Sequence, residues 1–177
     1  MSVSMDQVRE LRERTGAGIL EAKKVLEEVG GDMKKAIEIM RERGLKIADK
    51  KAGRETREGR IDVYVHANNR LAAMVEVNCE TDFVARNDEF IKLVKDIALH
   101  IASNPDVKYV RREDVPAGEA EAYDAGTPDE YYQKTVLLEQ PFVRDPSQTI
   151  ADLVRTAIAR TGENIVVRRF VRYELGA

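Results

Sequence analysis

The sequence predicts an α+β fold in two parts, an N-terminal bundle of three helices and a C-terminal domain built on an antiparallel sheet. Apolar residues recur with the helical period of about 3.6 up to residue 44, and after Gly59 the period changes to the strand value of about 2. A charged stretch with few apolar residues separates the two regions. We therefore expect a three-helix module at residues 1–44, a basic linker at 45–59 and an α+β domain at 60–177.

Glycines divide the N-terminal module into three short helices. Ser4 and Gln7 form a capping-box pattern at the first helix, and Asp32 can cap the third. Gly44 is expected to end the third helix. The apolar positions are Val8, Leu11, Ile19, Ala22, Val25, Leu26, Val29, Ala36, Ile37 and Met40. A module of this size is marginal alone, so we expect it to lean on a partner or on the rest of the chain.

The linker lies in the stretch RERGLKIADKKAGRETREGR, residues 41–60, which contains eight basic and four acidic residues. It has almost no apolar stripe, which predicts a solvated and partly helical segment. A phosphate-binding patch is the alternative. The stretch contains no aromatic side chain that could stack on bases, and this favours the solvated linker.

A hairpin and a helix are expected to begin the second domain. Ile61, Val63 and Val65 alternate with polar residues, and a second apolar run at 71–78 follows a turn at 67–69. Asn87 is a candidate N-cap for the next helix. The core stripe of that helix is Phe90, Leu93, Val94, Ile97, Ala98 and Ile101, and each large member stabilises the fold by roughly 1.5–3 kcal/mol when buried.

The last third of the chain predicts one more helix and one more strand. The segment 117–132, rich in Glu, Asp, Ala, Gly and Pro, is expected to be an exposed connection. The sequence DPSQ at 145–148 offers a cap, a proline at the first helical position and a capping-box partner, and Gly162 ends the helix. The segment NIVVRRFVRYE, 164–174, predicts a strand with Ile165, Val167, Val171 and Tyr173 on one face.

Composition excludes several classes of function. The formal charge of −3 gives nucleic acid no attractive field, so we expect no direct binding of DNA. One cysteine and two histidines supply no disulfide, metal set or Cys/His dyad, and no phosphate-binding glycine motif is present. His100 is expected to be structural, and His66, at a strand end, can equally be structural or solvated. No apolar run reaches the ~18 residues of a membrane span, and the N-terminus lacks signal-peptide features. We predict a cytoplasmic binding protein that is not an enzyme and needs no cofactor or metal.

The most unusual surface candidate is VNCETDFVARND, Val77–Asp88, where a β-like run ends before a helix. Thr81 and Asp82 form a polar pair there, and Phe83 is a large aromatic residue. Thr81 could be a helix cap and Phe83 an ordinary core side chain. The alternative is a turn that presents the ring to a partner, and these residues alone leave both interpretations open.

Two stretches together resemble the translation elongation factor Ts family. They are LRERTGAGILEAKKVL, Leu11–Leu26, and EVNCETDFVARN, Glu76–Asn87. LLEQPFVRDPSQTI and TGENIVVRRFVRYELG are similar to the same family, so the resemblance covers nearly the whole chain. It implies a ubiquitin-associated-like (UBA-like) bundle followed by an α+β dimerisation domain. The implied activity is guanine nucleotide exchange on the translational GTPase elongation factor Tu, in its GDP-bound and nucleotide-free states.

The resemblance also implies which residues contact the GTPase. It places Thr81, Asp82, Phe83 and Val84 beside the magnesium site of the GTPase, with Phe83 as a wedge. In the N-terminal module we expect contacts from Thr15, Gly16, Gly18, Ile19 and Leu20. Ile19 also fits the core of the module itself, and that alternative stays open.

The chain departs from longer family members, which carry two halves of the core domain and an inserted helical hairpin. A single half leaves sheet edges and an apolar face unpaired, and two-fold pairing of identical chains would restore the missing half. We therefore predict a homodimer that binds two GTPase molecules in a 2:2 complex. The alternatives are a UBA-like adaptor for another protein and a ribosome or RNA accessory protein that uses the basic residues.

Overall fold

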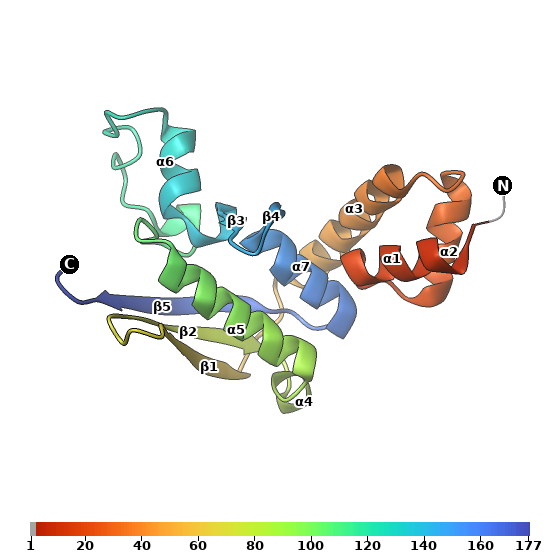
Figure 1. Ribbon diagram of the computed structural model, residues 1–177, viewed down its shortest axis with the longest axis horizontal. Helices are drawn as coiled ribbons and strands as arrows, with labels where there is room; N and C mark the ends of the chain where they lie inside the picture. The colour runs from red at the N-terminus through yellow and green to blue at the C-terminus, as the bar shows by residue number, and fades with distance from the viewer. Residues whose placement is uncertain (1–2) are drawn as a thin grey trace. The chain divides into compact units, whose positions relative to one another are not determined.

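The computed structural model describes residues 3–177 and contains two compact units (Figure 1). The first holds the chain up to Glu55 together with Arg155–Ile165, and the second holds Thr56–Val154 and Val166–Ala177. Helices α1–α3 and a three-stranded antiparallel sheet confirm the predicted α+β class. The domain boundaries predicted after residues 44 and 59 stay predictions.

The first unit is built on α1 (Met5–Thr15), α2 (Ile19–Glu28) and α3 (Met33–Lys51). The predicted capping box is confirmed: Ser4 Oγ accepts from Gln7 N at 3.1 Å, and Gln7 Oε1 accepts from Ser4 N at 3.0 Å. Asp32 caps α3 as predicted. The buried core of this unit is Val8, Leu11, Ala17, Ala22, Val25, Leu26, Ala36 and Met40.

The predicted end of the third helix at Gly44 is wrong, because α3 continues to Lys51. A glycine costs a helix interior about 1 kcal/mol relative to alanine, which packing beyond it can offset. Ala48, one turn after Gly44, is buried. Lys50 and Lys51 lie in the last turn, where positive charge favours the helix dipole.

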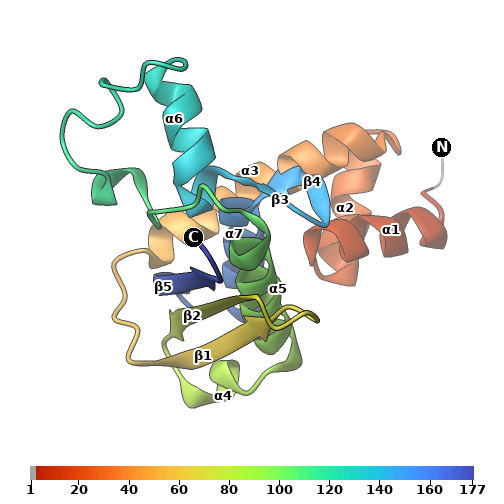
Figure 2. The same cartoon turned by 60° about the vertical axis from the view of Figure 1, so that its left-hand side comes forward.

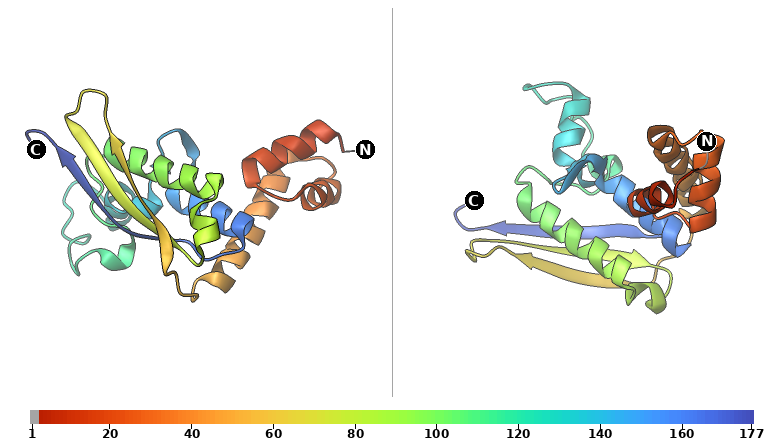
Figure 3. Two further views of the ribbon diagram at one scale, coloured as in Figure 1. Left: turned by 90° about the horizontal axis from the view of Figure 1, so that it is seen from below. Right: turned by 45° about the vertical axis from the view of Figure 1, so that its right-hand side comes forward.

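The second unit is built on the sheet β1-β2-β5, with β1 (Glu58–Val65), β2 (Leu71–Cys79) and β5 (Val166–Glu174) antiparallel throughout. The predicted β1–β2 hairpin is confirmed. Helix α5 (Asp88–Ser103) packs across β1 and β2 on one face of the sheet (Figures 1 and 3). Asn87 caps α5, and all six residues of the predicted stripe are buried.

The alternation predicted for the last strand is wrong beyond Val167, because β5 contains a bulge. Val77 pairs with Val167 and Glu76 pairs with Arg169, so Arg168 is an extra residue. One inserted residue reverses the side on which later residues point. Val167 therefore shares the α5 face with Val77, whereas Val171 and Tyr173 lie on the opposite face.

A helix begins inside the predicted exposed connection at 117–132 and continues beyond it, which makes that prediction wrong in part. Helix α6 (Pro128–Thr135) begins with a capping box between Thr127 and Glu130 and has proline at its start. Ala120 and Tyr131 are buried, so the segment packs within its unit. Two short 3₁₀ helices, η1 (Arg112–Asp114) and η2 (Leu137–Glu139), flank this region.

The helix predicted from Asp145 begins later. Residues Asp145–Thr149 form β4, which pairs with β3 (Pro141–Phe142), and α7 spans Ile150–Thr161. The cap is Thr149: its Oγ1 accepts from Asp152 N at 3.1 Å, and Asp152 Oδ2 accepts from Thr149 N at 2.9 Å. Gly162, with φ of 71°, ends α7 as predicted.

Candidate protein-binding site

The TDFV turn, Thr81–Val84, joins the end of β2 to the short helix α4 (Asp82–Ala85), beside the start of α5 (Figure 2). Thr81 is the cap, because its side chain accepts a hydrogen bond from Val84 N at 3.4 Å. Val84 and Ala85 are half-buried, and α4 packs against β1 and β2. One side of the turn is therefore anchored on the sheet.

Phe83 points away from that anchored side. Its side chain is 84% exposed, although the next aromatic residue, Phe90, is fully buried. An exposed ring gains none of the ~1.5–3 kcal/mol that burial of a large apolar side chain provides. The interpretation of Phe83 as a core side chain is therefore wrong.

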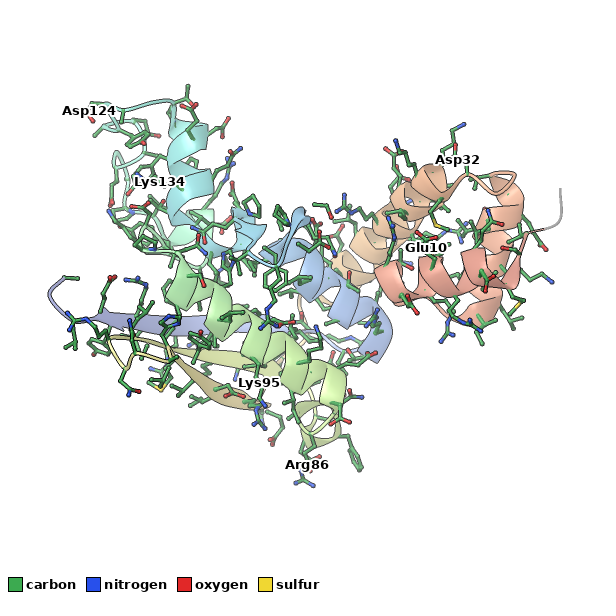
Figure 4. The ribbon with its side chains drawn as sticks, in the orientation of Figure 1. Glu10, Asp32, Arg86, Lys95, Asp124 and Lys134 are labelled. Atoms are coloured by element: carbon green, nitrogen blue, oxygen red, sulfur yellow. The ribbon has the colours of Figure 1, made fainter. Side chains whose placement is uncertain are left out.

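Charged groups flank the exposed ring. Asp82 forms an ion pair with Arg86 at 3.0 Å, one helical turn away. Arg86 lies at the outer tip of this region (Figure 4) and is largely exposed. Surface pairs of this kind stabilise a fold by about 0–1 kcal/mol, so Asp82 can exchange this partner for another at little cost.

The other predicted contact residues gather at the α1–α2 junction of the first unit. Gly16 ends α1 with φ of 72°, and Gly18 is the N-cap of α2. Thr15 Oγ1 donates to Leu11 O at 2.6 Å, so its hydroxyl is used within α1. Ile19 and Leu20, at the start of α2, are 49% and 84% exposed. The alternative of Ile19 as a core residue is therefore wrong, since half of its side chain meets solvent.

The face of the sheet opposite α5, called here the outer face, is apolar and exposed. Its residues Ile61, Val63, Val65, Met74 and Tyr173 are between 44% and 72% exposed. In β1 the polar residues Asp62 and Tyr64 point toward the α5 side instead. This reverses the usual arrangement, in which the apolar side of a strand faces the core.

A polar group lies at one end of the outer face. Glu76 accepts hydrogen bonds from Arg169 Nε at 2.7 Å and from Asn78 Nδ2 at 3.2 Å. The hydrogen bond from Arg169, with that from Asn78, holds the pKa of the Glu76 carboxyl below its ordinary value. The outer face thus combines an apolar region with one ion pair.

A groove of about 480 Å³ lies on the α5 side, between β1 and α5. It is lined by Asp62, Val63, Tyr64, Asp88, Ile91, Lys92, Lys95, Asp96, Leu99 and Arg144. Lys95 is labelled on α5 in Figure 4. Asp96, the buried carboxylate, is paired with Lys92 at 2.7 Å and with Arg144 at 3.0 Å. Within residues 3–177 no group of His, Cys, Asp and Glu is placed to hold a metal ion.

His100 is structural, as predicted, and is fully buried. Its Nδ1 lies 3.2 Å from Val143 N, which can only donate, so Nε2 carries the proton that is donated to Gln140 Oε1 at 2.9 Å. Burial lowers the pKa of His100, against the opposing effect of the Gln140 hydrogen bond. Of the two roles left open for His66, the exposed one is found, and its Nδ1 lies 3.0 Å from Tyr64 Oη.

Met74, Tyr173 and Asp62 were not predicted from the sequence as site residues. The alternation in β1 and β2 separates two faces, but it does not indicate which face meets α5. Met74 lies between Ala73 and Val75, which are both buried on the core face. The alternation along β2 was therefore a signal that Met74 lies on the other face. Over the described residues, none of the helices is long and apolar enough to cross a membrane.

Comparison with known proteins identifies a family. The model of the family described as elongation factor TS matches residues 5–124 and 110–177. Elongation factor Ts of Herpetosiphon aurantiacus is 54% identical over 199 residues, covering 100% of both chains. The proteins of the same name from Thermoanaerobacter sp. strain X514 and Thermotoga petrophila are each 48% identical, and the alignments cover 95% and 98% of those proteins.

Proposed function

The chain belongs to the elongation factor Ts family and is thus a translation elongation factor, and from this premise we propose that it is a guanine nucleotide exchange factor for elongation factor Tu. It binds the GDP complex of that GTPase, promotes release of GDP and leaves the site open for GTP. The protein forms and breaks no covalent bond in this process. Its place of action is the cytoplasm, where the GTPase serves translation.

The exposure of Phe83 carries this proposal. A ring that is 84% exposed on a capped helix anchored at its other side is available to a partner without unfolding. Aromatic side chains bring a large contact area on two rotatable bonds, and they are enriched among the residues that dominate binding energy. Phe83 is therefore the residue that we assign to the contact with the nucleotide-binding site.

The mechanism follows from how a GTPase holds its nucleotide. Backbone amides cradle the phosphates, and a magnesium ion with a strict octahedral shell completes the site. Insertion of Phe83 beside that site would displace one of its walls, and each 1.4 kcal/mol of lost interaction weakens GDP binding about tenfold. Thr81 holds the turn, Val84 anchors it, and Asp82 leaves Arg86 to bond to a group that the ring displaces.

The N-terminal module supplies affinity in this proposal. Leu20, 84% exposed at the start of α2, and Ile19, half-exposed beside it, are its apolar anchors. Gly16 and Gly18 allow the chain to reverse direction between the helices, and Thr15 closes the end of α1. This contact binds the GTPase equally in its two states, so it strengthens the complex without discriminating against GDP.

A second copy of the chain is the occupant that we propose for the outer face. Two chains related by a two-fold axis would bury both apolar regions against each other. The charges also fit: Glu76 is already paired with Arg169 of the same chain at 2.7 Å, so covering this face would leave neither of these two charges without a partner. With one TDFV turn in each chain, the homodimer binds two GTPase molecules in a 2:2 complex.

The test is release of a fluorescent GDP analogue from elongation factor Tu with excess unlabelled GDP present. We expect the release rate to rise with the concentration of this protein and then to saturate. An unchanged rate at saturating protein would contradict the proposal. In that case, a pull-down from lysate that captures another protein as the dominant partner would support the UBA-like adaptor. RNA binding that weakens steeply with salt would support the ribosome or RNA accessory protein.

A further inference from the structure

The strand β1 has an accessible free edge. Within residues 3–177 the sheet order is β1-β2-β5, so β1 pairs with β2 alone, along the eight residues Glu58–Val65. The groove between β1 and α5 is lined by Asp62, Val63 and Tyr64, in the middle of this strand. Long free edges are templates for pairing with another chain, and proteins usually protect them.

The direction of the backbone amides shows which groups a new strand would meet. His66 N donates to Leu71 O across the hairpin at 2.9 Å. In an antiparallel pair the residues that bond to the partner strand alternate with residues whose amides point away. The N–H groups of Val63 and Val65 therefore point to the free edge.

Asp62 occupies the amide in the middle of this edge. Its Oδ1 accepts from Val63 N at 2.9 Å, and its Oδ2 accepts from Arg60 Nε at 3.0 Å. The Asp62 side chain is only 16% exposed, so it is held in place by its surroundings. A new strand needs consecutive backbone hydrogen bonds, and loss of the Val63 amide leaves only short stretches on either side of it.

We propose that Asp62 prevents another strand from pairing with the β1 edge and thereby directs association between copies of this chain to the outer face of the sheet. The inference rests on the homodimer of the proposed function. Both surfaces belong to one strand: the side chains of Val63 and Val65 point to the outer face, while their amides point to the edge. Asp62 closes the edge and leaves the apolar face free for a second copy.

Amide hydrogen exchange measured by NMR tests the hydrogen bond itself. In the wild type, the Val63 amide should exchange about tenfold more slowly than the Val65 amide, although both point to the same edge. Asp62→Asn keeps an acceptor oxygen and should retain this difference, whereas Asp62→Ala should abolish it. Equal exchange of Val63 and Val65 in the wild type would overturn the proposal even if Asp62→Ala failed to fold.

Light scattering over a range of concentrations tests the consequence for assembly. The mass of the wild type and of Asp62→Asn should level off at twice the 20.0 kDa chain, and Asp62→Ala should form larger species that increase with concentration. Asp62→Ala that stops at the wild-type mass would overturn the proposal. If the wild type has the mass of a single chain, the homodimer of the proposed function is wrong. In that case, larger species formed by Asp62→Ala but not by the wild type would still support the role of Asp62 at the β1 edge.

Discussion

The thiol of Cys79 donates a hydrogen bond to the carbonyl oxygen of Thr81 across 3.2 Å. Cys79 is the last residue of β2 and is fully buried, and Thr81 caps the helix that carries Phe83. The bond therefore joins the rigid end of the sheet to the turn proposed to enter the GTPase. Its function would be to position the ring, since the thiol itself is buried and cannot contact the GTPase directly.

Replacement of Cys79 should affect exchange more than stability. Cys79→Val removes the donor at similar volume, and a thiol is a weak donor, so we expect a loss of about 0.5–1 kcal/mol of stability. GDP release at saturating protein should fall several-fold, because the turn is less well held. Cys79→Ser, which keeps a donor, is the control. A Cys79→Val variant with full exchange activity would show that the bond has no positioning role.

Phe83→Ala should leave the fold intact and reduce the discrimination between GTPase states. A factor that weakens GDP binding is itself weakened by GDP to the same extent, by linkage. If the ring supplies much of this coupling, the gap between affinities for GDP-bound and nucleotide-free elongation factor Tu should shrink by ~1–3 kcal/mol. Asp82→Ala should cause a smaller change in the same direction. Calorimetric titration of both states measures the gap.

The control for that variant is the buried aromatic residue of the same unit. Phe90→Ala should destabilise the fold by about 3–5 kcal/mol, because it empties a core position. A melting temperature that falls as far for Phe83→Ala would contradict the assignment of Phe83 to the interface. So would an unchanged affinity gap.

Leu20→Ala should weaken the complex without changing its exchange step. Leu20 is almost fully exposed, so its removal should leave the unit folded while affinity falls by ~1–2 kcal/mol. Excess protein should then restore the full rate of GDP release, unlike for Phe83→Ala. Leu26→Ala is the matched control, because Leu26 is fully buried and its truncation should cost about 2–5 kcal/mol of stability. Unchanged affinity of the Leu20 variant would remove α2 from the interface.

The free energy of unfolding should decrease as the pH falls, because His100 is buried in its neutral form. Its pKa is lowered in the fold, so the unfolded chain binds protons more readily, and the stabilisation is complete only above the ordinary value of about 6.5. It is lost as the pH falls through that value toward the lower folded pKa. Protonation of Nδ1 would also break the bond from Val143. Urea unfolding between pH 7.5 and 5 should show this slope, and His100→Asn should flatten it; an equal slope in the variant would assign it to other groups.

Local signals in the sequence were sufficient for much of this fold. Ser4 with Gln7, Asp32 and Asn87 each cap a helix as predicted, because a cap depends on residues within one turn. The stripe from Phe90 to Ile101 is also local, since its spacing alone defines one face. The exposure of Phe83, by contrast, needed the family resemblance, because a ring at a helix start has no local signal that separates core from surface.

The errors arose where distant parts of the chain decide the outcome. The bulge at Arg168 depends on pairing with β2, and it moves Tyr173 to the outer face. Gly44 stays inside α3 because the helix packs beyond it. The segment at Asp145 has the residues of a helix start, but it pairs with β3 and uses that carboxylate within the strand, where Asp145 Oδ1 accepts from Ser147 N at 3.2 Å. Which face of β1 meets α5 is likewise fixed only by tertiary packing.

The outer face allows a direct test of the homodimer. Met74 lies on β2, the central strand, and is 44% exposed, so it would lie near the middle of a face-to-face interface. Met74→Lys would bury an ammonium group against apolar residues without a partner, and we expect the dissociation constant to rise at least ~100-fold, about 3 kcal/mol. The chain should stay folded, because a lysine at this exposed position can remain in water when the chains separate.

Val143→Lys is the matched control, since Val143 is 46% exposed but lies outside the sheet. Sedimentation equilibrium should give one chain for Met74→Lys and two for both the wild type and Val143→Lys. A Met74→Lys variant that remains a dimer with unchanged affinity would exclude the outer face as the interface between copies.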